Sequence, residues 1–151
     1  MNNEMPKVAV VIPCYRVSKN LKSVLNEIGP EVSSIYCVDD NCPEESWKTA
    51  ESIANNDNRI RVIRREKNGG VGAAVISGYK AALEDDAEII VKIDGDGQMS
   101  PKLVPKFIKP ITENRADFIK GNRFYDLKSI SGMPFVRILG NSMLSFINKL
   151  S

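Results

Sequence analysis

Short apolar runs alternate with amphipathic stretches along almost the whole chain. The runs that predict β-strands lie at 7–13, 32–39, 59–65, 88–93 and 116–121. The stretches that predict helices lie at 18–29, 44–56, 70–85, 101–113 and 135–150. Strands and helices that alternate at this spacing form βαβ units, whose strands run parallel because each helix crosses over the sheet. We therefore expect the α/β class, as a three-layer α/β/α sandwich with a mainly parallel, Rossmann-like sheet.

The composition is that of one globular domain, which we expect to span residues 1–151. Hydrophobic residues make up 42% and charged residues 26% of the chain, and the net charge is +2, so nothing suggests a nucleic-acid partner. A basic patch at 59–67 fits a solvated strand end with its loop better than a phosphate surface. The chain has no histidine, so a metal site would use oxygen or sulfur, and a general base would be a carboxylate, Lys, Tyr or Cys.

The three cysteines, Cys14, Cys37 and Cys42, have neither a disulfide-framework spacing nor a zinc-site spacing. We expect free thiols in a reducing compartment. The first residues lack an apolar signal region, and no stretch reaches the roughly 18 apolar residues of a membrane span. These features predict a cytoplasmic chain.

An acidic turn follows the fourth apolar run, which we expect to form a strand buried on both faces. Asp94 and Asp96 lie one residue apart, and Gly95 and Gly97 let the backbone turn sharply. Two carboxylates in such a turn suit a divalent cation that also holds a phosphate. By turn chemistry alone, the same residues could form a loop without a ligand. A calcium EF-hand is excluded, because its glycine and glutamate positions hold Met99 and Pro105.

A glycine-rich segment at 67–79 opens the predicted third helix. The dinucleotide motif G-x-G-x-x-G fails here because its third glycine would be Val75, and no P-loop motif is present. The segment could offer backbone donors to a phosphate, or it could be a tight turn with close helix packing. Two alternatives also remain open for Asp39 and Asp40, which could accept from a nucleobase or ribose or could cap the next helix.

Four of these turns follow successive predicted strands, at 13–15, 39–40, 68–70 and 94–98. The carboxyl ends of parallel strands meet at one edge of the sheet, where open α/β sheets bind ligands. The sequence therefore predicts a nucleotide site with its metal ion at this edge.

Six segments, taken in order, resemble the family 2 glycosyltransferases of the GT-A fold. They are VVIPCYRVSKNL, IYCVDDNCPEES, KNGGVGAAVISGYKAAL, VKIDGDGQMSP, DFIKGNRF and MPFVRILGNSML. Together they cover nearly the whole chain, and they are most similar to the polyprenyl-phosphate sugar transferases, such as the dolichyl-phosphate mannose synthases. One departure is local: Asn41 to Glu44 replace the glycine, serine and further small residues that usually follow the two aspartates.

The resemblance implies a role for each matching residue. The residues implied for nucleotide binding are Pro13, Tyr15, Asp39, Asp40, Asn68, Gly70 and Asp94. The residues implied for the metal ion, Mg²⁺ or Mn²⁺, are Asp94, Asp96 and Gln98. Arg123 and Arg137 would hold the phosphate of the acceptor, although a surface ion pair and a helix-face charge would also explain them.

The resemblance further implies metal-dependent, inverting transfer of a sugar from a UDP- or GDP-linked donor. The acceptor would be a polyprenyl phosphate or a glycan, as in cell-envelope glycan biosynthesis. The general base is expected beyond Ser151, in a chain that we expect to be truncated, and a longer protein could contact the cytoplasmic face of a membrane peripherally. Two alternatives are a non-catalytic nucleotide-binding or assembly domain, and a sugar-phosphate nucleotidyltransferase. The latter is disfavoured because the loop after the first strand lacks glycine.

Overall fold

A four-stranded, fully parallel sheet forms the centre of the computed structural model, which describes residues 5–121. The strands are β1 (Val8–Cys14), β2 (Ser34–Asp39), β3 (Ile60–Arg64) and β4 (Ile89–Lys92), in the spatial order β3-β2-β1-β4. The chain divides into one unit of Met1–Asp117 and another of Phe118–Ser151, and the description below concerns the first, apart from the backbone and exposure of 118–121. The predicted helix at 135–150, Arg123 and Arg137 lie outside the described residues.

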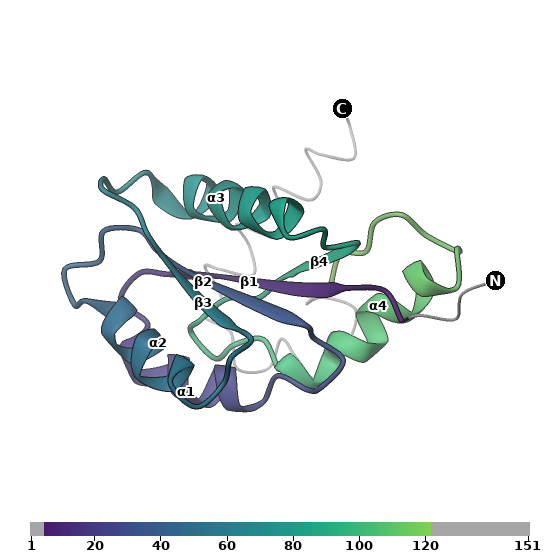
Figure 1. The fold of residues 1–151 in the computed structure, drawn as a ribbon, viewed down its shortest axis with the longest axis horizontal. Coiled ribbons are helices and arrows are strands. Elements are labelled where there is room, and N and C mark those ends of the chain that lie inside the picture. Colours follow the sequence, from purple (N-terminus) through teal and green to yellow (C-terminus); the bar gives the residue numbers. More distant parts are fainter. Residues whose placement is uncertain (1–4, 122–151) are drawn as a thin grey trace, which may run out of the picture. The chain divides into compact units, whose positions relative to one another are not determined.

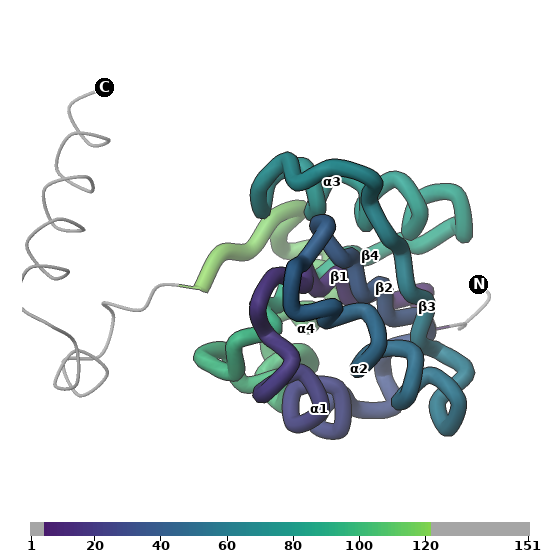
Figure 2. The backbone as a smooth tube through the Cα atoms, turned by 90° about the vertical axis from the view of Figure 1, so that its left-hand side faces the viewer, coloured from purple at the N-terminus to yellow at the C-terminus, as the bar shows by residue number. Residues whose placement is uncertain are grey.

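Helices cover both faces of this sheet and complete three layers (Figure 1). On one face lies α3 (Gly70–Glu84), and on the other lie α1 (Ser18–Asn26), α2 (Ser46–Ala54) and α4 (Val104–Thr112). Figure 2 shows the same arrangement nearly end-on, with α3 on one side of the strands and the other helices opposite. The α/β/α sandwich predicted from the sequence is confirmed. Among the described helices, none is both long and apolar enough to cross a membrane.

The core is split by β1, whose seven residues are all buried. Because successive side chains of a strand point to opposite faces, Val10 and Ile12 pack toward α1 and α2, whereas Ala9 and Val11 pack toward α3. The apolar face of α1 repeats at helical spacing, with Leu21, Val24 and Leu25 buried.

Two expectations about strands are wrong. Residues 116–121 form no strand, and Phe118 is 80% exposed, because its apolar neighbour is only Ile119 and the surrounding residues are charged or small. The strand at the acidic turn is not buried on both faces: Ile89 is buried, but the rest of β4 is half-buried. Within the described sheet β4 pairs only with β1, so it is an edge strand, and the doubly buried strand is β1.

The predicted helix at 101–113 divides into a short 3₁₀ turn, η1 (Pro101–Leu103), followed by α4. Pro105 lies in the first turn of α4, where its missing N–H costs no intrahelical hydrogen bond. The predicted helix at 44–56 is also shorter, since α2 begins at Ser46 after Glu45 takes a left-handed backbone conformation.

Arg59, which directly precedes β3, forms an ion pair with Asp57 and also binds the connection between α1 and β2. The Arg59 guanidinium donates to both oxygens of Asp57, at 3.0 and 2.8 Å, and to the carbonyl oxygens of Gly29 and Val32, at 2.7 and 3.2 Å. The hydrogen bond from Arg59 lowers the pKa of the Asp57 carboxyl below its ordinary value. A lowered folded-state pKa means that the stabilisation is present above the ordinary aspartate value, about 3.9, and is lost as the pH falls through the lower folded pKa.

We expect Asp57→Asn to lower the free energy of unfolding by about 1 kcal/mol near neutral pH, because the charge-assisted hydrogen bonds are lost. The difference from wild type should disappear once the pH is below the folded-state pKa of Asp57. Urea unfolding of both proteins near neutral pH and below the folded-state pKa of Asp57 measures this difference. An equal loss of stability at both pH values would contradict the assignment of the ion pair.

Candidate nucleotide and metal site at the carboxyl edge of the sheet

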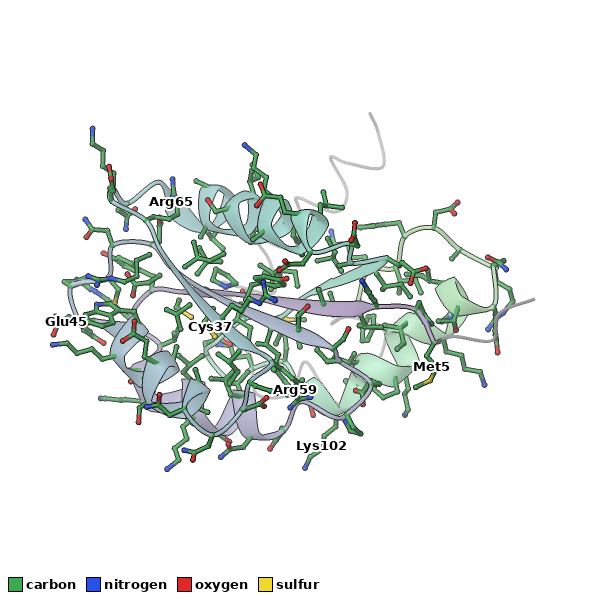
Figure 3. All side chains as sticks on the ribbon, in the orientation of Figure 1. Met5, Cys37, Glu45, Arg59, Arg65 and Lys102 are labelled. Carbon is green, nitrogen blue, oxygen red and sulfur yellow. The ribbon has the colours of Figure 1, made fainter. Side chains whose placement is uncertain are left out.

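The carboxyl ends of all four strands lie at one edge, as parallel pairing requires. In the register, Cys14 at the end of β1 is level with Asp39 at the end of β2, and Asp39 is level with Arg64 of β3. On the other side of β1, Val11 is level with Lys92, so the acidic turn follows two residues later. Figure 3 shows Arg65 and Glu45 toward this end of the sheet and Met5 at the opposite end.

The strand order creates a topological switch point beside β1. From β1 the chain moves outward through β2 to β3, and it then returns to place β4 on the other side of β1. The connections on the two sides of a switch point diverge, and ligands of open α/β sheets bind in the crevice that they leave. The backbones of β2 and β4 are about 10 Å apart, two strand spacings. Asp39–Asp40 and the acidic turn therefore flank the end of β1.

The acidic turn is held by its own backbone and by α1. A carboxylate oxygen of Asp96 accepts the backbone N–H of Gln98 at 2.9 Å. The backbone carbonyl of Asp96 accepts the side-chain N–H of Asn20 at 2.6 Å. The Asp94 carboxylate contacts the ammonium of Lys92. Gly97 has a φ of 78°, which only glycine adopts without strain. The turn thus has a fixed backbone while Asp94 and Asp96 stay half-exposed.

Asp39 is 3% exposed and caps the start of α2 from outside the helix. One of its oxygens accepts the Cys42 N–H at 2.9 Å, and the other accepts the Trp47 N–H at 3.1 Å. Trp47 is the second residue of α2, whose own first-turn N–H groups need acceptors. The capping alternative is therefore realised, and the two neutral donors leave lone pairs of this carboxylate available, since a carboxylate accepts about four hydrogen bonds.

Asp40 is equally buried but has different partners. It pairs with the Arg65 guanidinium, and its oxygens accept the Gly69 N–H at 3.1 and 3.2 Å. The residues on either side of Gly69 are also fixed, because the Asn68 side-chain oxygen accepts the Gly70 N–H at 3.1 Å and Gly70 has a φ of 80°. The loop at 68–70 is thereby attached to the end of β2.

The loop after β1 carries an exposed aromatic ring. Pro13 is buried within β1, whereas Tyr15 is 42% exposed, and the Arg16 guanidinium lies 5.6 Å from the centre of its ring. The Arg16 N–H donates to the Cys42 sulfur at 3.1 Å. Burial raises the pKa of the Cys42 thiol, but hydrogen bonds from the Ser46 hydroxyl and from backbone N–H groups outweigh it and leave that pKa below its ordinary value. The sulfur therefore acts as an acceptor that joins the loops after β1 and β2.

The donor set of the acidic turn fits Mg²⁺ or Mn²⁺ that is shared with a phosphate. Two carboxylates and one amide oxygen are hard ligands, and Mg²⁺ commonly binds one or two carboxylates together with substrate phosphates and water. Among residues 5–121, no group of three or more His, Cys, Asp or Glu side chains could hold a metal ion by itself. The turn therefore suits a metal ion that arrives with a diphosphate.

The structure brings the loops after all four strands to one edge, and it joins the second to the third and α1 to the fourth. The metal and nucleotide roles of the residues at this edge stay predictions. Sequence analysis did not find three of the contributing side chains, Asn20, Arg65 and Lys92. Lys92 could have been found, because side chains two apart on a strand share a face. The partner of Asn20 is 76 residues away and left no signal.

Comparison with known proteins gives one family for nearly the whole chain. The family described as Glycosyl transferase family 2 matches residues 9–148. The chain is 33% identical to UDP-N-acetylglucosamine–dolichyl-phosphate N-acetylglucosaminyltransferase of Methanococcus voltae, with 95% of this chain and 62% of that protein covered. It is 34% identical to dolichol-phosphate mannosyltransferase of Pyrococcus furiosus, with 88% and 38% covered. The chain thus spans only part of these relatives' lengths.

A solved structure with a similar fold is that of the mannosyltransferase PcManGT from Pyrobaculum calidifontis in complex with GDP-Man and Mn²⁺. The TM-score is 0.53 at 15% identity, over 68% of this chain and 31% of that one. At this identity the likeness concerns the fold alone, and it agrees with the GT-A type of α/β/α sandwich.

Proposed function

Since the chain belongs to glycosyl transferase family 2, we propose that it binds a UDP- or GDP-linked sugar and serves its transfer, with inversion, to a polyprenyl phosphate. The named activities of the Methanococcus and Pyrococcus relatives support a nucleotide-sugar donor and a lipid-phosphate acceptor. A glycan acceptor is the second candidate within the same family.

One observation carries the proposal: the acidic turn and the buried aspartates flank the end of β1 at the switch point of the sheet. A nucleotide diphosphate in this crevice would have its base near Asp39 and its diphosphate near Asp94 and Asp96. The span of about two strand spacings between them suits a nucleoside with its phosphates.

Each residue has a role in this arrangement. Pro13 and Tyr15 would form one wall of the nucleotide pocket, and Asp39 would accept a base N–H through its remaining lone pairs. Asn68 and Gly70 would line the opposite wall, where the first turn of α3 presents backbone N–H groups. Arg123 and Arg137 stay proposed phosphate ligands from the sequence resemblance.

Asp94, Asp96 and Gln98 would hold Mg²⁺ or Mn²⁺, which would neutralise the negative charge that develops on the leaving diphosphate. The fixed backbone of the turn aligns these ligands before the donor arrives, so little reorganisation is needed. Lys92, in contact with Asp94, adds a positive charge to the same side of the site. A phosphate acceptor is already ionised near neutral pH, so its attack on the anomeric carbon would need little help from a general base.

A polyprenyl phosphate resides in a bilayer, so we place the reaction at the cytoplasmic face of a membrane, with peripheral contact by the protein. The donor nucleotide would then come from the cytoplasm, and only the phosphate of the lipid would need to reach the carboxyl edge of the sheet.

Thermal unfolding with UDP, GDP and their sugars, each with Mn²⁺, tests the donor site directly. At a ligand concentration of about 100 times its Kd, one bound nucleotide stabilises the folded chain by about 2.7 kcal/mol, which for this size raises Tm by about 5–10 °C. Chelation of the metal with EDTA should remove most of the shift. An equal shift with ADP would indicate a general diphosphate site, and no shift with any nucleotide would contradict the proposal.

Turnover distinguishes the proposed enzyme from the two alternatives. Transfer of labelled sugar to a short polyprenyl phosphate would support the transferase, whereas donor binding without transfer or hydrolysis, also in a longer protein, would favour a binding domain. Pyrophosphate-dependent formation of a nucleoside triphosphate would indicate a nucleotidyltransferase instead.

A further inference from the structure

Asp40 is a buried carboxylate whose two side-chain partners, Arg65 and Gly69, both lie in the segment between β3 and α3. Its side chain is 4% exposed, and it accepts the Gly69 N–H with both oxygens while it pairs with Arg65. A buried carboxylate without such partners would be strongly unfavourable, so this pairing is a condition of the local structure. Asp40 follows β2, whereas Arg65 and Gly69 follow β3.

The side chains of Arg65 and Ala73 fill the space around Gly69. A Cβ atom at this position would lie 2.7 Å from a guanidinium nitrogen of Arg65 and 2.9 Å from the Cβ of Ala73. The backbone of Arg65 is also fixed, because its N–H donates to the Asp39 carbonyl at 2.9 Å. Asp40, Arg65 and Gly69 therefore form a packed unit, here named the loop clamp.

Asp39 and Asp40 differ in how their charge is used. Asp39 accepts two neutral backbone N–H groups, and no cation pairs with it among the described residues. Asp40 is neutralised by the Arg65 guanidinium, whose side chain is itself only 24% exposed. A ligand N–H or hydroxyl would meet an unneutralised carboxylate at Asp39, whereas at Asp40 it would compete with the charge-assisted contact to Arg65.

We infer that Asp40 is a positioning residue, which holds Asn68 to Gly70 in the shape that receives the nucleotide without contacting the nucleotide itself. This inference rests on the proposed function and changes the role expected for Asp40 from its sequence. The left-handed Gly70 directly follows Gly69, and the Asn68–Gly70 hydrogen bond spans it, so release of Gly69 would free both. A loop that must first be ordered binds its ligand more weakly, because the ordering cost is subtracted from the binding free energy.

The test compares Asp40→Asn with wild type in the 151-residue chain, by titration calorimetry with UDP and GDP in the presence of Mn²⁺. Asparagine keeps the size and one acceptor oxygen but removes the charge that pairs with Arg65. We expect about tenfold weaker binding. The matched control is Asp57→Asn. It breaks the ion pair with Arg59, which lies at the opposite end of β3 from Arg65, and it should change the affinity by less than about twofold.

Ligand analogues separate positioning from direct contact. The probes are UDP, 2′-deoxy-UDP, 3′-deoxy-UDP and N3-methyl-UDP, each of which lacks one donor or none. If Asp40 acts through the loop, Asp40→Asn weakens all four by the same factor. If the penalty vanishes for one analogue, Asp40 contacts the group that this analogue lacks, and the inference is overturned.

The clamp also has a signature that needs no ligand. We expect the Gly69 amide hydrogen to exchange with solvent at least about tenfold faster in Asp40→Asn, while the Val11 amide in the sheet keeps its protection. Unchanged Gly69 exchange would overturn the clamp itself. If the wild-type chain bound no nucleotide, the proposed function would fail and the role of Asp40 in binding with it, whereas the exchange experiment would still report on the clamp.

Discussion

Asp96→Ala is expected to abolish metal-dependent donor binding, with a loss of at least about 100-fold in affinity for UDP or GDP in the presence of Mn²⁺. The substitution removes a carboxylate from the acidic turn, and with it the acceptor of the Gln98 N–H, but Asn20 still holds the turn through the Asp96 carbonyl and Gly97 keeps its positive φ. The metal would then have one carboxylate of the turn, Asp94, which already contacts Lys92.

Titration calorimetry with and without EDTA measures this loss. Wild type should bind tightly only with the metal, and Asp96→Ala should bind equally weakly in both conditions. Glu84→Ala is the matched control, because it removes an exposed carboxylate from the end of α3 that lies away from this edge. Metal-dependent binding by Asp96→Ala within about threefold of wild type would end the assignment of the metal site.

The layers of the fold were predictable because they depend on local periodicity. The apolar spacing in α1 and the alternating faces of β1 follow from the helical and strand repeats, and the short runs between them leave little freedom for the connections. Which strand is central was not predictable in this way. The runs at β1 and β4 look alike in the sequence, and only the strand order makes β1 fully buried and β4 an edge strand.

In the candidate site, too, the features that depend on local sequence were predictable and the contacts between distant residues were not. The acidic turn and the position of Asp39 could be predicted, since each follows a strand and strand ends share an edge. The contacts that fix these turns could not, because Asn20 is 76 residues from Asp96 and Asp40 is 29 residues from Gly69. Arg65 illustrates the difficulty: in the sequence it belongs to a basic patch that suggests solvated charges, but in the structure it neutralises a buried aspartate.

Gly78→Ala is expected to lower the free energy of unfolding by about 2 kcal/mol, although alanine is the better helix former by about 1 kcal/mol. Gly78 lies where α3 packs on the sheet, and an added Cβ would be 2.4 Å from Val11 Cγ1 and 3.1 Å from Val38 Cγ2. Both valines are fully buried in central strands and have stiff side chains, so α3 must move away from the sheet.

Gly72→Ala in the same helix is the matched control. A Cβ there has no atom within 4 Å and the backbone has no positive φ, so the gain in helix propensity should raise stability by about 0.5 kcal/mol. The two variants should therefore differ by about 2–3 kcal/mol in urea unfolding, which corresponds to roughly 5–10 °C in Tm for a domain of this size. Equal stabilities would contradict the close approach of α3 to β1 and β2.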